Sequence, residues 1–420
     1  MAKAREERVG MSYAIEEIIG NKPVLIWGAR ALGCGVCKMV QRANRAILGF
    51  VDSDPCFRNK KILGYTVYSP DQLKDLAFAD VRPFIIIASS LSEDVISEKC
   101  VAIGLKKEFD FCSVTKFCDC EYIIDIVGAC NLKCPSCPRG NFRIQPKAGT
   151  ISVDTFRLVV VKILTETPNV NSVSLYNWGE PFLHPQLADL IGILREHKIF
   201  CSLSTNFNIR RDFEDVIRAC PDMLKVSVSG YYQDSYGKTH TAGNINLVKS
   251  NLYKLRYLMD IYAPGLMVEI IYHKYKHNVK EDYDRMQQLC EELNFQFASV
   301  YAYLSPVEKV IDYVEGKLLD HDKKFTDMLS VNIGDALKIS QSKKSSCCPL
   351  LNNQIVINWD TSVSLCCASF DPDKTIVHNN FLSTTTEEIK KAKIKNALCN
   401  KCMKYGVHQY YFETAQCVKE

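Results

Sequence analysis

The chain lacks the long apolar run, roughly 18 residues or more, that a membrane-spanning helix requires. It also lacks an export signal, because residues 1–20 mix acidic and basic side chains without a continuous apolar core. Internal repeats, low-complexity tracts and dense blocks of one charge are absent as well. These absences predict a cytoplasmic protein that has no membrane partner.

The charges of the chain are nearly balanced. Lys and Arg number 52 and Asp and Glu 48, which gives a net charge of +4. Because no basic patch stands out, we expect no nucleic acid partner. Apolar residues make up 47% of the chain and charged residues 24%, as in folded globular proteins. A length of 420 residues favours two or three domains.

Cysteine, by contrast, is abundant, at 20 of 420 residues. A cytoplasmic chain of this length does not need disulfides, so clustered cysteines indicate metal or redox chemistry. Cysteines that lie singly in apolar stretches are expected to pack as small hydrophobic side chains. This second group comprises Cys34, Cys37, Cys56, Cys100, Cys112, Cys201, Cys220 and Cys290.

Residues 1–120 predict a Rossmann-like α/β domain. The runs PVLIWG, AILGFVD and PFIIIAS predict strands, and helical patterns follow them. Gly28, Gly33 and Asp52 stand where nucleotide-binding folds contact their ligand, but GARALG lacks the middle glycine of the fingerprint. Nucleotide binding and a purely structural or substrate-docking role both stay open. The stretches GFVDSDP and LGYTVYSPDQL resemble the nucleotide-sugar-binding domain of bacterial sugar acetyltransferases.

Residues 121–305 alternate six predicted strands with amphipathic helices. The strands begin near Tyr122, Ser172, Phe200, Met223, Leu266 and Phe295. Such a repeat predicts parallel strands, with functional residues at their carboxyl ends. The fold class is therefore α/β: a partial (β/α)6 barrel flanked by an N-terminal Rossmann-like α/β domain and a small C-terminal cysteine-rich cluster domain.

A polar, helical connector is predicted for residues 306–346, and the cysteine-rich domain for residues 347–420. The runs NQIVINWD and SVSLCC predict a hairpin that turns at Asp360 and Thr361. The rest of this domain shows no clear periodicity, so we expect it to be irregular and stabilised by a metal.

The strand YIIDIVG is followed directly by CNLKCPSC, which places Cys130, Cys134 and Cys137 in a C-x3-C-x2-C pattern. Cysteine thiolates hold iron-sulfur clusters, and a cubane cluster bound by three thiolates keeps one iron open. The pattern and its position after the first barrel strand resemble the radical S-adenosylmethionine (SAM) superfamily. This resemblance implies a 4Fe-4S cluster whose open iron binds SAM, and hydrogen abstraction from the substrate by a 5′-deoxyadenosyl radical.

The alternative for these three cysteines is a zinc site, with His184 and His273 as remote candidates for a fourth ligand. Ser136 also departs from the family, which often has an aromatic residue at this position.

Further positions match the family in the expected order. The stretch NWGEPFLHP resembles the G-x-G-E-P motif whose backbone receives the SAM amino group, and the third and fourth strands end where the family contacts the SAM ribose and carboxylate. Taken singly, these residue types also favour caps and turns. The resemblance implies SAM-binding roles for Asn177, Gly179, Glu180, Pro181, Ser204, Asn206 and Ser229.

The C-terminal region supplies a second set of thiols, Cys348, Cys366, Cys399 and Cys402. The run CPLLNNQIVINWDTSVSLCC resembles the SPASM and Twitch extensions of radical SAM enzymes, and the number of cysteines fits one Twitch-type auxiliary 4Fe-4S cluster. Either thiol of the pairs Cys347/Cys348 and Cys366/Cys367 could bind. A structural zinc site is the alternative for four cysteines that end in C-x2-C.

We therefore expect a radical SAM enzyme that acts on a small polar molecule, a sugar or nucleotide sugar, by dehydrogenation, epimerisation or related chemistry. Its second partner would be an electron donor such as flavodoxin or ferredoxin. Modification of a ribosomal peptide and a non-catalytic metal-binding protein on the same fold are the alternatives. No catalytic base is assigned among the polar residues of the late strands, which are Glu269, Tyr272, His273, Tyr301 and Tyr303.

Overall fold

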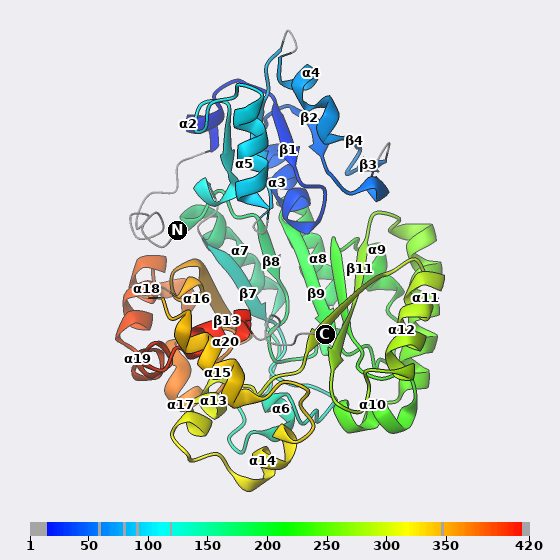
Figure 1. The fold of residues 1–420 in the computed structure, drawn as a ribbon, viewed down its shortest axis with the longest axis vertical. Helices are drawn as coiled ribbons and strands as arrows, with labels where there is room; N and C mark the ends of the chain where they lie inside the picture. Colours follow the sequence, from blue (N-terminus) through cyan, green and yellow to red (C-terminus); the bar gives the residue numbers. More distant parts are fainter. Residues whose placement is uncertain are drawn as a thin grey trace.

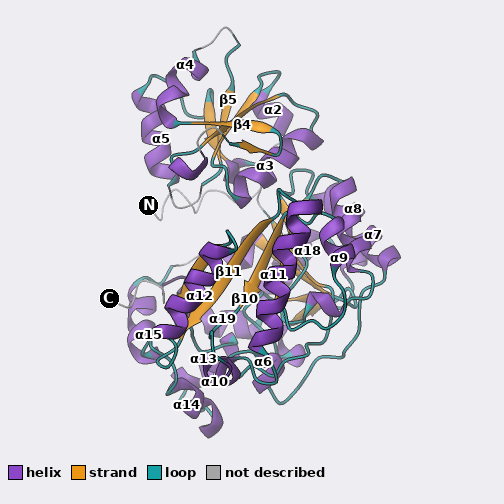
Figure 2. Ribbon diagram, turned by 90° about the vertical axis from the view of Figure 1, so that its right-hand side faces the viewer, coloured by secondary structure: helices purple, strands orange, loops and turns teal. Residues whose placement is uncertain are grey.

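The structure is a computed structural model that describes residues 15–57, 60–78, 81–89, 92–117, 120–345 and 348–413. It is a mixed α/β fold built on two sheets that are rich in parallel strands, one of six strands and one of nine (Figure 1). The smaller sheet belongs to a unit that stands apart at one end of the molecule (Figure 2). Within the described ranges, no helix has both the length and the apolar character needed to cross a bilayer.

The six-stranded sheet has the order β3-β4-β2-β1-β5-β6. Its strands are β1 (Val24–Trp27), β2 (Ile47–Val51), β3 (Lys61–Ile62), β4 (Tyr65–Tyr68), β5 (Phe84–Ile87) and β6 (Phe111–Ser113). Every residue of β1 and β5 is buried, because helices cover both faces of this largely parallel sheet. These helices are α2 (Ile15–Ile19), α3 (Ala31–Arg42), α4 (Leu73–Ala77) and α5 (Glu93–Ala102).

Glycine allows α3 to start tight against β1. A Cβ at Gly33 would lie 1.8 Å from the carbonyl oxygen of Gly28, which itself has a φ of 122°. The Asp52 carboxylate accepts a hydrogen bond from the Ala29 amide at 2.8 Å. Asp52 is thus engaged by its own domain, and its predicted role toward a nucleotide stays a prediction.

The nine-stranded sheet has the order β12-β11-β10-β9-β8-β7-β13-β14-β15. All six strands expected between residues 121 and 305 are present, and neighbours among them pair in parallel. They are β7 (Glu121–Asp125), β8 (Ser172–Ser174), β9 (Phe200–Thr205), β10 (Met223–Ser227), β11 (Met267–Lys274) and β12 (Gln296–Tyr301).

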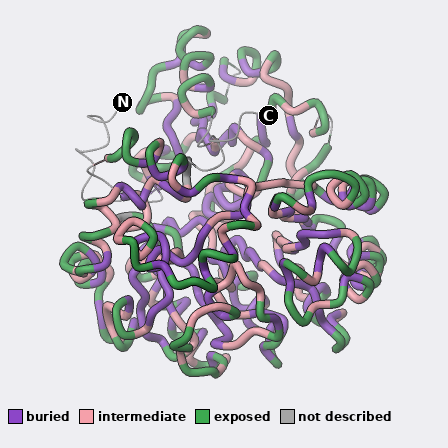
Figure 3. The backbone as a smooth tube through the Cα atoms, turned by 60° about the horizontal axis from the view of Figure 1, so that its bottom comes forward, coloured by how far each residue is buried: buried purple, intermediate pink, exposed green. Residues whose placement is uncertain are grey.

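Four helices between these strands follow the predicted amphipathic segments: α7 (Val153–Glu166), α8 (Leu187–Glu196), α11 (Ile245–Tyr262) and α12 (Glu281–Glu292). The shorter helices α6 (Pro138–Asn141), α9 (Glu214–Arg218) and α10 (Gln233–Thr239) were not singled out from the sequence. The apolar faces of the four longer helices and the strands form one continuous core, which includes Phe156, Leu190 and Leu252. The buried backbone accordingly runs through the middle of the molecule, and exposed segments form its rim (Figure 3).

The connector is helical, as predicted. It contains α13 (Val307–Val314), α14 (Asp320–Thr326) and α15 (Ile333–Ser342). These helices share a separate core with the C-terminal region, in which Val310, Leu337 and Val407 are buried.

The predicted C-terminal hairpin is present. Strand β13 (Gln354–Asn358) pairs antiparallel with β14 (Val363–Ser364), and Thr361 adopts a φ of 68° in the turn between them. The sequence did not reveal that β13 also pairs in parallel with β7, so that the C-terminal strands extend the central sheet.

The expectation that the rest of this region is irregular is wrong. It forms α16 (Pro349–Asn353), α17 (Pro372–Thr375), β15 (Ile376–His378), α18 (Thr386–Lys395), α19 (Ala397–Lys404) and α20 (Val407–Glu413). These helices are short, and their buried faces carry cysteine and lysine as well as apolar residues, so their sequence lacks a clear hydrophobic period.

The N-terminal unit docks through α3 onto residues that immediately precede β8, β9 and β10. The Arg42 guanidinium donates to the carbonyl oxygens of Val170 at 2.6 Å and Lys198 at 2.9 Å. The Lys38 ammonium forms a largely buried ion pair with Asp222 at 2.5 Å. The contact therefore lies at the amino ends of these parallel strands, opposite the end at which active sites gather in such folds.

Replacing Lys38 with methionine should destabilise this junction, because Asp222 would stay buried without its counter-charge. Breaking a buried ion pair costs about 3–5 kcal/mol. The decrease in the free energy of unfolding is measured by urea denaturation that follows the N-terminal unit and the rest of the protein separately. The exposed pair Arg157–Glu196 is the matched control, since Arg157→Met should cost less than about 1 kcal/mol. Equal effects of the two substitutions would contradict the assignment of Lys38 to a buried junction.

Candidate active site

Loops that leave the carboxyl ends of β7, β8, β9 and β10 meet at one edge of the central sheet. The cysteine loop with Cys130, Cys134 and Cys137 follows β7. The segment with Gly179 and Glu180 follows β8. All three thiols are half-buried, and burial raises their pKa.

The three thiols lie within electrostatic reach of one another. Cys137 and Cys130 add to the effect of burial on the pKa of Cys134. The Cys130 sulfur also accepts from the Leu132 amide at 3.5 Å and from the Asn206 side chain at 3.6 Å. Among the described residues, no three His, Cys, Asp or Glu side chains are arranged around a single metal ion. The loop thus gathers its thiols in one neighbourhood with hydrogen-bond donors that suit thiolates.

Arg139 places a buried positive charge beside this loop. Its charge lowers the pKa of Cys130, Cys137 and Asp125, all of which burial raises. The guanidinium carbon lies 5.4 Å from the centre of the Phe370 ring. Arg139 therefore compensates negative charge at the cysteine loop, a role that the sequence pattern did not reveal.

Asp125, the last residue of β7, holds the segment that follows β8. Its carboxylate accepts from the amides of Gly179 at 3.0 Å and Trp178 at 3.3 Å, and burial raises its pKa to about 6. The approach is so close that a Cβ at Gly179 would lie 1.8 Å from the carbonyl oxygen of Val127. Only glycine fits at position 179 without a shift of one of these segments.

The Glu180 side chain points into the protein. Its carboxylate accepts from the Thr205 hydroxyl at 2.7 Å, the Asn206 amide at 2.8 Å and the Phe182 amide at 3.1 Å. Burial raises its pKa to about 7. Glu180 thus joins the segment after β8 to the end of β9, and its own amide donates to the carbonyl oxygen of Ala129 at 2.9 Å.

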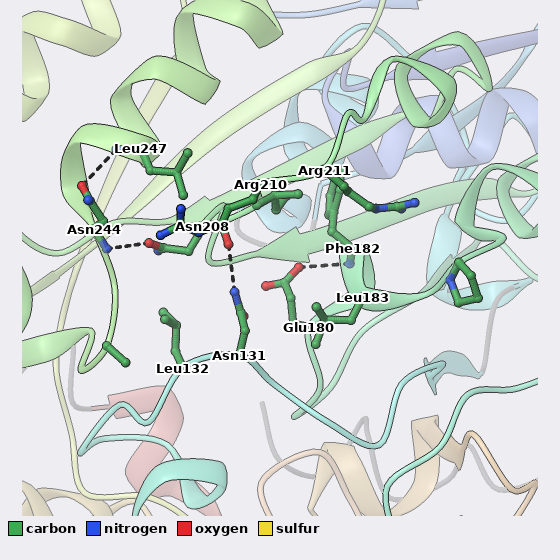
Figure 4. A pocket seen from close by; sticks show the side chains of 13 residues that line it. Asn131, Leu132, Glu180, Phe182, Leu183, Asn208, Arg210, Arg211, Asn244 and Leu247 are labelled. Atoms are coloured by element: carbon green, nitrogen blue, oxygen red, sulfur yellow. Dashed lines mark hydrogen bonds between the residues drawn. The ribbon is translucent and has the colours of Figure 1, made fainter.

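Asparagines join the end of β9 to the cysteine loop. The Asn206 side chain donates to Asn131 at 2.9 Å, and the Asn131 side chain donates to the carbonyl oxygen of Asn208 at 2.8 Å. Asn208 in turn accepts from the Asn244 amide at 2.6 Å. Figure 4 shows the bonds that join Asn131 and Asn244 to Asn208, around a pocket of about 610 Å³ where Glu180 also lies. Asn131, Asn208 and Asn244 were not singled out from the sequence.

The remaining predicted SAM-binding residues are less closely connected. Ser229 is fully buried after β10, and its hydroxyl accepts from the His273 amide of β11 at 3.1 Å. Ser204 lies half-buried near the end of β9, and Asn177 lies half-buried before Trp178. Pro181 begins a short 3-10 helix. Their roles toward SAM stay predictions.

Several side chains considered from the sequence are engaged by the protein. Both ring nitrogens of His184 bond to the backbone, at Ile151 and Gln186, which removes it as a metal ligand. The Tyr272 hydroxyl donates to the carbonyl oxygen of Asn278. The Tyr301 ring lies 3.9 Å from the Lys274 ammonium.

Two other tyrosines adjoin the cysteine sites. The Tyr275 hydroxyl is hydrogen-bonded to Ser136, so the residue that directly follows β11 brings an aromatic ring next to the position that is aromatic in the resembled family. The pKa of Tyr303 is raised by burial and by Cys367. Glu269 lies half-buried on β11.

The second set of thiols also gathers in space. Cys348 precedes α16, Cys366 follows β14, and Cys399 and Cys402 lie on α19. After burial, the neighbouring thiols Cys366, Cys348 and Cys399 raise the pKa of Cys402. Cys347 lies outside the described residues.

Cys367 faces a different environment from Cys366. Its amide donates to Gln354, and its thiol is influenced by Cys366, Glu121 and Lys393. We therefore expect Cys366→Ala to lose the metal of the second site and Cys367→Ala to keep it. Metal analysis of the two purified variants measures the difference, and the reverse order would assign the ligand to Cys367.

A direct contact connects the two cysteine sites. The Trp178 indole donates to the carbonyl oxygen of Ser369 at 3.0 Å, and its ring packs edge-on against Phe370 at 6.0 Å. Residues 366–371 therefore attach the second cysteine site to the segment that carries Gly179.

Comparisons with known proteins match parts of this chain. Residues 20–108 match the family described as C2185-like, N-terminal. A protein of Pyrococcus furiosus, named tungsten-containing aldehyde ferredoxin oxidoreductase cofactor-modifying protein, is 22% identical over 257 residues. That alignment covers 58% of this chain and 69% of the relative.

Solved structures that are similar to this chain include native anSMEcpe with bound AdoMet, at 16% identity and a TM-score of 0.44, covering 67% of this chain and 82% of the other. Streptococcus suis SuiB bound to S-adenosylmethionine has 13% identity and a TM-score of 0.45, covering 79% and 81%. BtrN in complex with AdoMet and 2-DOIA has 12% identity and a TM-score of 0.37, covering 71% and 90%.

Proposed function

We propose that this chain is a radical SAM enzyme that cleaves SAM reductively at a 4Fe-4S cluster held by Cys130, Cys134 and Cys137. The observation that carries the proposal is the union of the cysteine loop with the Gly179–Glu180 segment. Gly179 donates to Asp125 on the strand that leads into the loop. Asn206 donates through its amide to Glu180 and through its side chain to Cys130. Loop and segment are the parts that the resembled family uses for cluster and cofactor.

The residues of the loop fit such a cluster. Three thiols lie on one loop, and a backbone amide and an asparagine side chain donate hydrogen bonds to sulfur. This arrangement suits a cubane that keeps one iron open. Arg139 compensates the negative charge that thiolates bring into a half-buried site. When bound, cluster and SAM together supply a 5′-deoxyadenosyl radical that abstracts a hydrogen atom from the substrate.

The chain's own residues hold this site in shape. Asp125 and Glu180 use buried carboxylates to fix the segment after β8, and Asn206 fixes the end of β9 against the cysteine loop. Because these groups are bonded before any ligand arrives, the site is preorganised. The loops around the carboxyl ends of the strands would also shield the reaction from water.

The second site fits a Twitch-type cluster held by Cys348, Cys366, Cys399 and Cys402. Four protein thiolates leave no open iron, which favours electron transfer over direct binding of substrate. The contact from Trp178 to Ser369 supports a site that works together with the first. The name of the Pyrococcus furiosus relative, a cofactor-modifying protein, is consistent with chemistry on a bound substrate.

The substrate would reach the carboxyl ends of the strands. The N-terminal unit docks at the opposite ends, through Lys38 and Arg42, so its position does not support delivery of a sugar to this site. The position of that unit therefore favours neither candidate substrate, a sugar or nucleotide sugar on the one hand and a ribosomal peptide on the other. Transfer of deuterium from labelled candidates into 5′-deoxyadenosine would identify the substrate and the attacked carbon.

Anaerobic reconstitution tests the proposal. We expect roughly eight irons per chain for two cubane clusters, and release of 5′-deoxyadenosine when reductant and SAM are added. A flavodoxin or ferredoxin would serve as the physiological electron donor. Zinc in place of iron, together with no cleavage of SAM, would instead establish a non-catalytic metal-binding protein.

A further inference from the structure

Lys393 occupies a buried position of α18 (Thr386–Lys395), where an apolar residue is the usual choice. It lies on α18 one turn after Ile389, and both side chains face the interior with an exposed fraction of 0%. Its neighbours Lys391 and Lys395 on the same helix are exposed. Of these three lysines of α18, only Lys393 is buried, and the sequence alone does not distinguish it from the exposed ones.

Thiols, and no carboxylate among the described residues, lie close enough to act on the charge of Lys393. Its ammonium donates to the carbonyl oxygen of Gln354 on β13. Among the described residues, no Asp or Glu lies within ion-pair distance of it. The thiols that act on it electrostatically are those of Cys366, Cys120, Cys367 and Cys348.

A buried ammonium needs negative charge nearby. Desolvating an ion costs several kcal/mol even after the protein relaxes, and one carbonyl dipole does not neutralise a full charge. Neutral thiols would not supply that charge either. A metal centre ligated by four thiolates carries net negative charge and would supply it.

We propose that Lys393 is the internal counter-cation of the metal centre held by Cys348, Cys366, Cys399 and Cys402, and that it makes this centre easier to reduce. The inference rests on the proposed function, because it takes the centre to be an iron-sulfur cluster. Reduction by an external donor such as dithionite adds one electron and thus one negative charge to the cluster. A fixed positive charge beside it stabilises the reduced form more than the oxidised form.

The test uses the full chain with Cys130, Cys134 and Cys137 all replaced by alanine, so that only the second cluster is present. A redox titration followed by electron paramagnetic resonance gives its midpoint potential. We expect Lys393→Met and Lys393→Gln to retain iron and to disfavour reduction at least tenfold, which corresponds to about 59 mV for a one-electron couple. Lys391→Met, on the exposed face of the same helix, should leave the potential unchanged.

Two matched variants separate charge from anchoring. Lys393→Gln keeps a hydrogen-bond donor for Gln354 but removes the charge. If the midpoint potential of this variant equals that of the protein with Lys393, the role of Lys393 is only to anchor Gln354, and the inference is overturned. If both neutral variants lose iron, Lys393→Arg decides: retention of iron with the original potential supports a counter-cation, and loss of iron contradicts it.

The result is independent of the first cluster. Zinc at the second site would overturn this inference while leaving cleavage of SAM at the first site intact. Conversely, a chain that cleaves no SAM but shows the expected shift of potential would refute the proposed function alone.

Discussion

Replacing Cys134 with alanine should lower the iron content from roughly eight to roughly four per chain and abolish release of 5′-deoxyadenosine. Cys134 is the central thiol of its loop, and both neighbouring thiols act on it. With two thiolates left, the first cluster loses the ligand set that keeps a cubane in place. Iron analysis and chromatography of the SAM products measure both effects.

The control for this substitution is Cys56→Ala, because Cys56 lies in the N-terminal unit and is exposed, contrary to the expectation that it packs as a small hydrophobic side chain. That variant should keep its iron and its activity. Full activity of Cys134→Ala would show that another residue binds the cluster, and an unchanged iron content would place the iron elsewhere in the chain.

Gly179→Ala should slow SAM cleavage by about 100-fold, the cost in rate of a misplacement of roughly 1 Å at a preorganised site, and should weaken SAM binding. The added methyl would lie 1.8 Å from the carbonyl oxygen of Val127 and 2.9 Å from the Asp125 carboxylate. The segment after β8 would have to move away from β7, and Glu180 would move with it. Chromatography of the SAM products measures the rate, anaerobic calorimetry with SAM on the reconstituted protein measures the affinity, and iron content should stay near that of the unmodified chain.

Gly192→Ala is the matched control, since a Cβ at Gly192 on α8 meets no atom within 4 Å. Alanine favours helix more than glycine does, so this variant should bind SAM normally and gain a little stability. Equal SAM affinities of the two variants would contradict the role given to the segment around Gly179.

The parts of the molecule that the sequence predicted are those with local signals. Strands β7 to β12 and the amphipathic helices between them follow periods that are read within one segment. The cysteine loop was predicted from a pattern of eight consecutive residues, 130–137. The hairpin at Asp360 and Thr361 was predicted in the same way.

The residues that were missed depend on contacts between distant segments. In the sequence, Asp125 is an ordinary acidic residue at the end of a strand. Only the structure shows that Gly179, 54 positions away, donates a hydrogen bond to it. Arg139 follows the third cysteine as an ordinary basic residue, and only its burial against Phe370 shows its position between the two cysteine sites. Lys393 has the same character, because its helix repeats lysine and no local rule indicates which one is buried.

The docking of the N-terminal unit was hidden for a similar reason. Gly35 permits α3 to approach Asn171, where a Cβ would lie 1.5 Å from the amide oxygen. The sequence shows a glycine within a helical pattern and does not show what it faces. The expectation of a sugar substrate rested partly on this unit, and its placement at the amino ends of the strands does not support that link.

The parallel pairing of β7 with β13 has a consequence for how the protein matures. Glu121 and Gln354, which pair at the start of the two strands, are separated by 233 positions. Contacts of such long range form late in folding, so the strand that leads into the cysteine loop keeps a bare edge while most of the chain is being synthesised. Iron insertion would then follow completion of translation, and a chain shortened before β13 would be expected to aggregate before it acquires its metal.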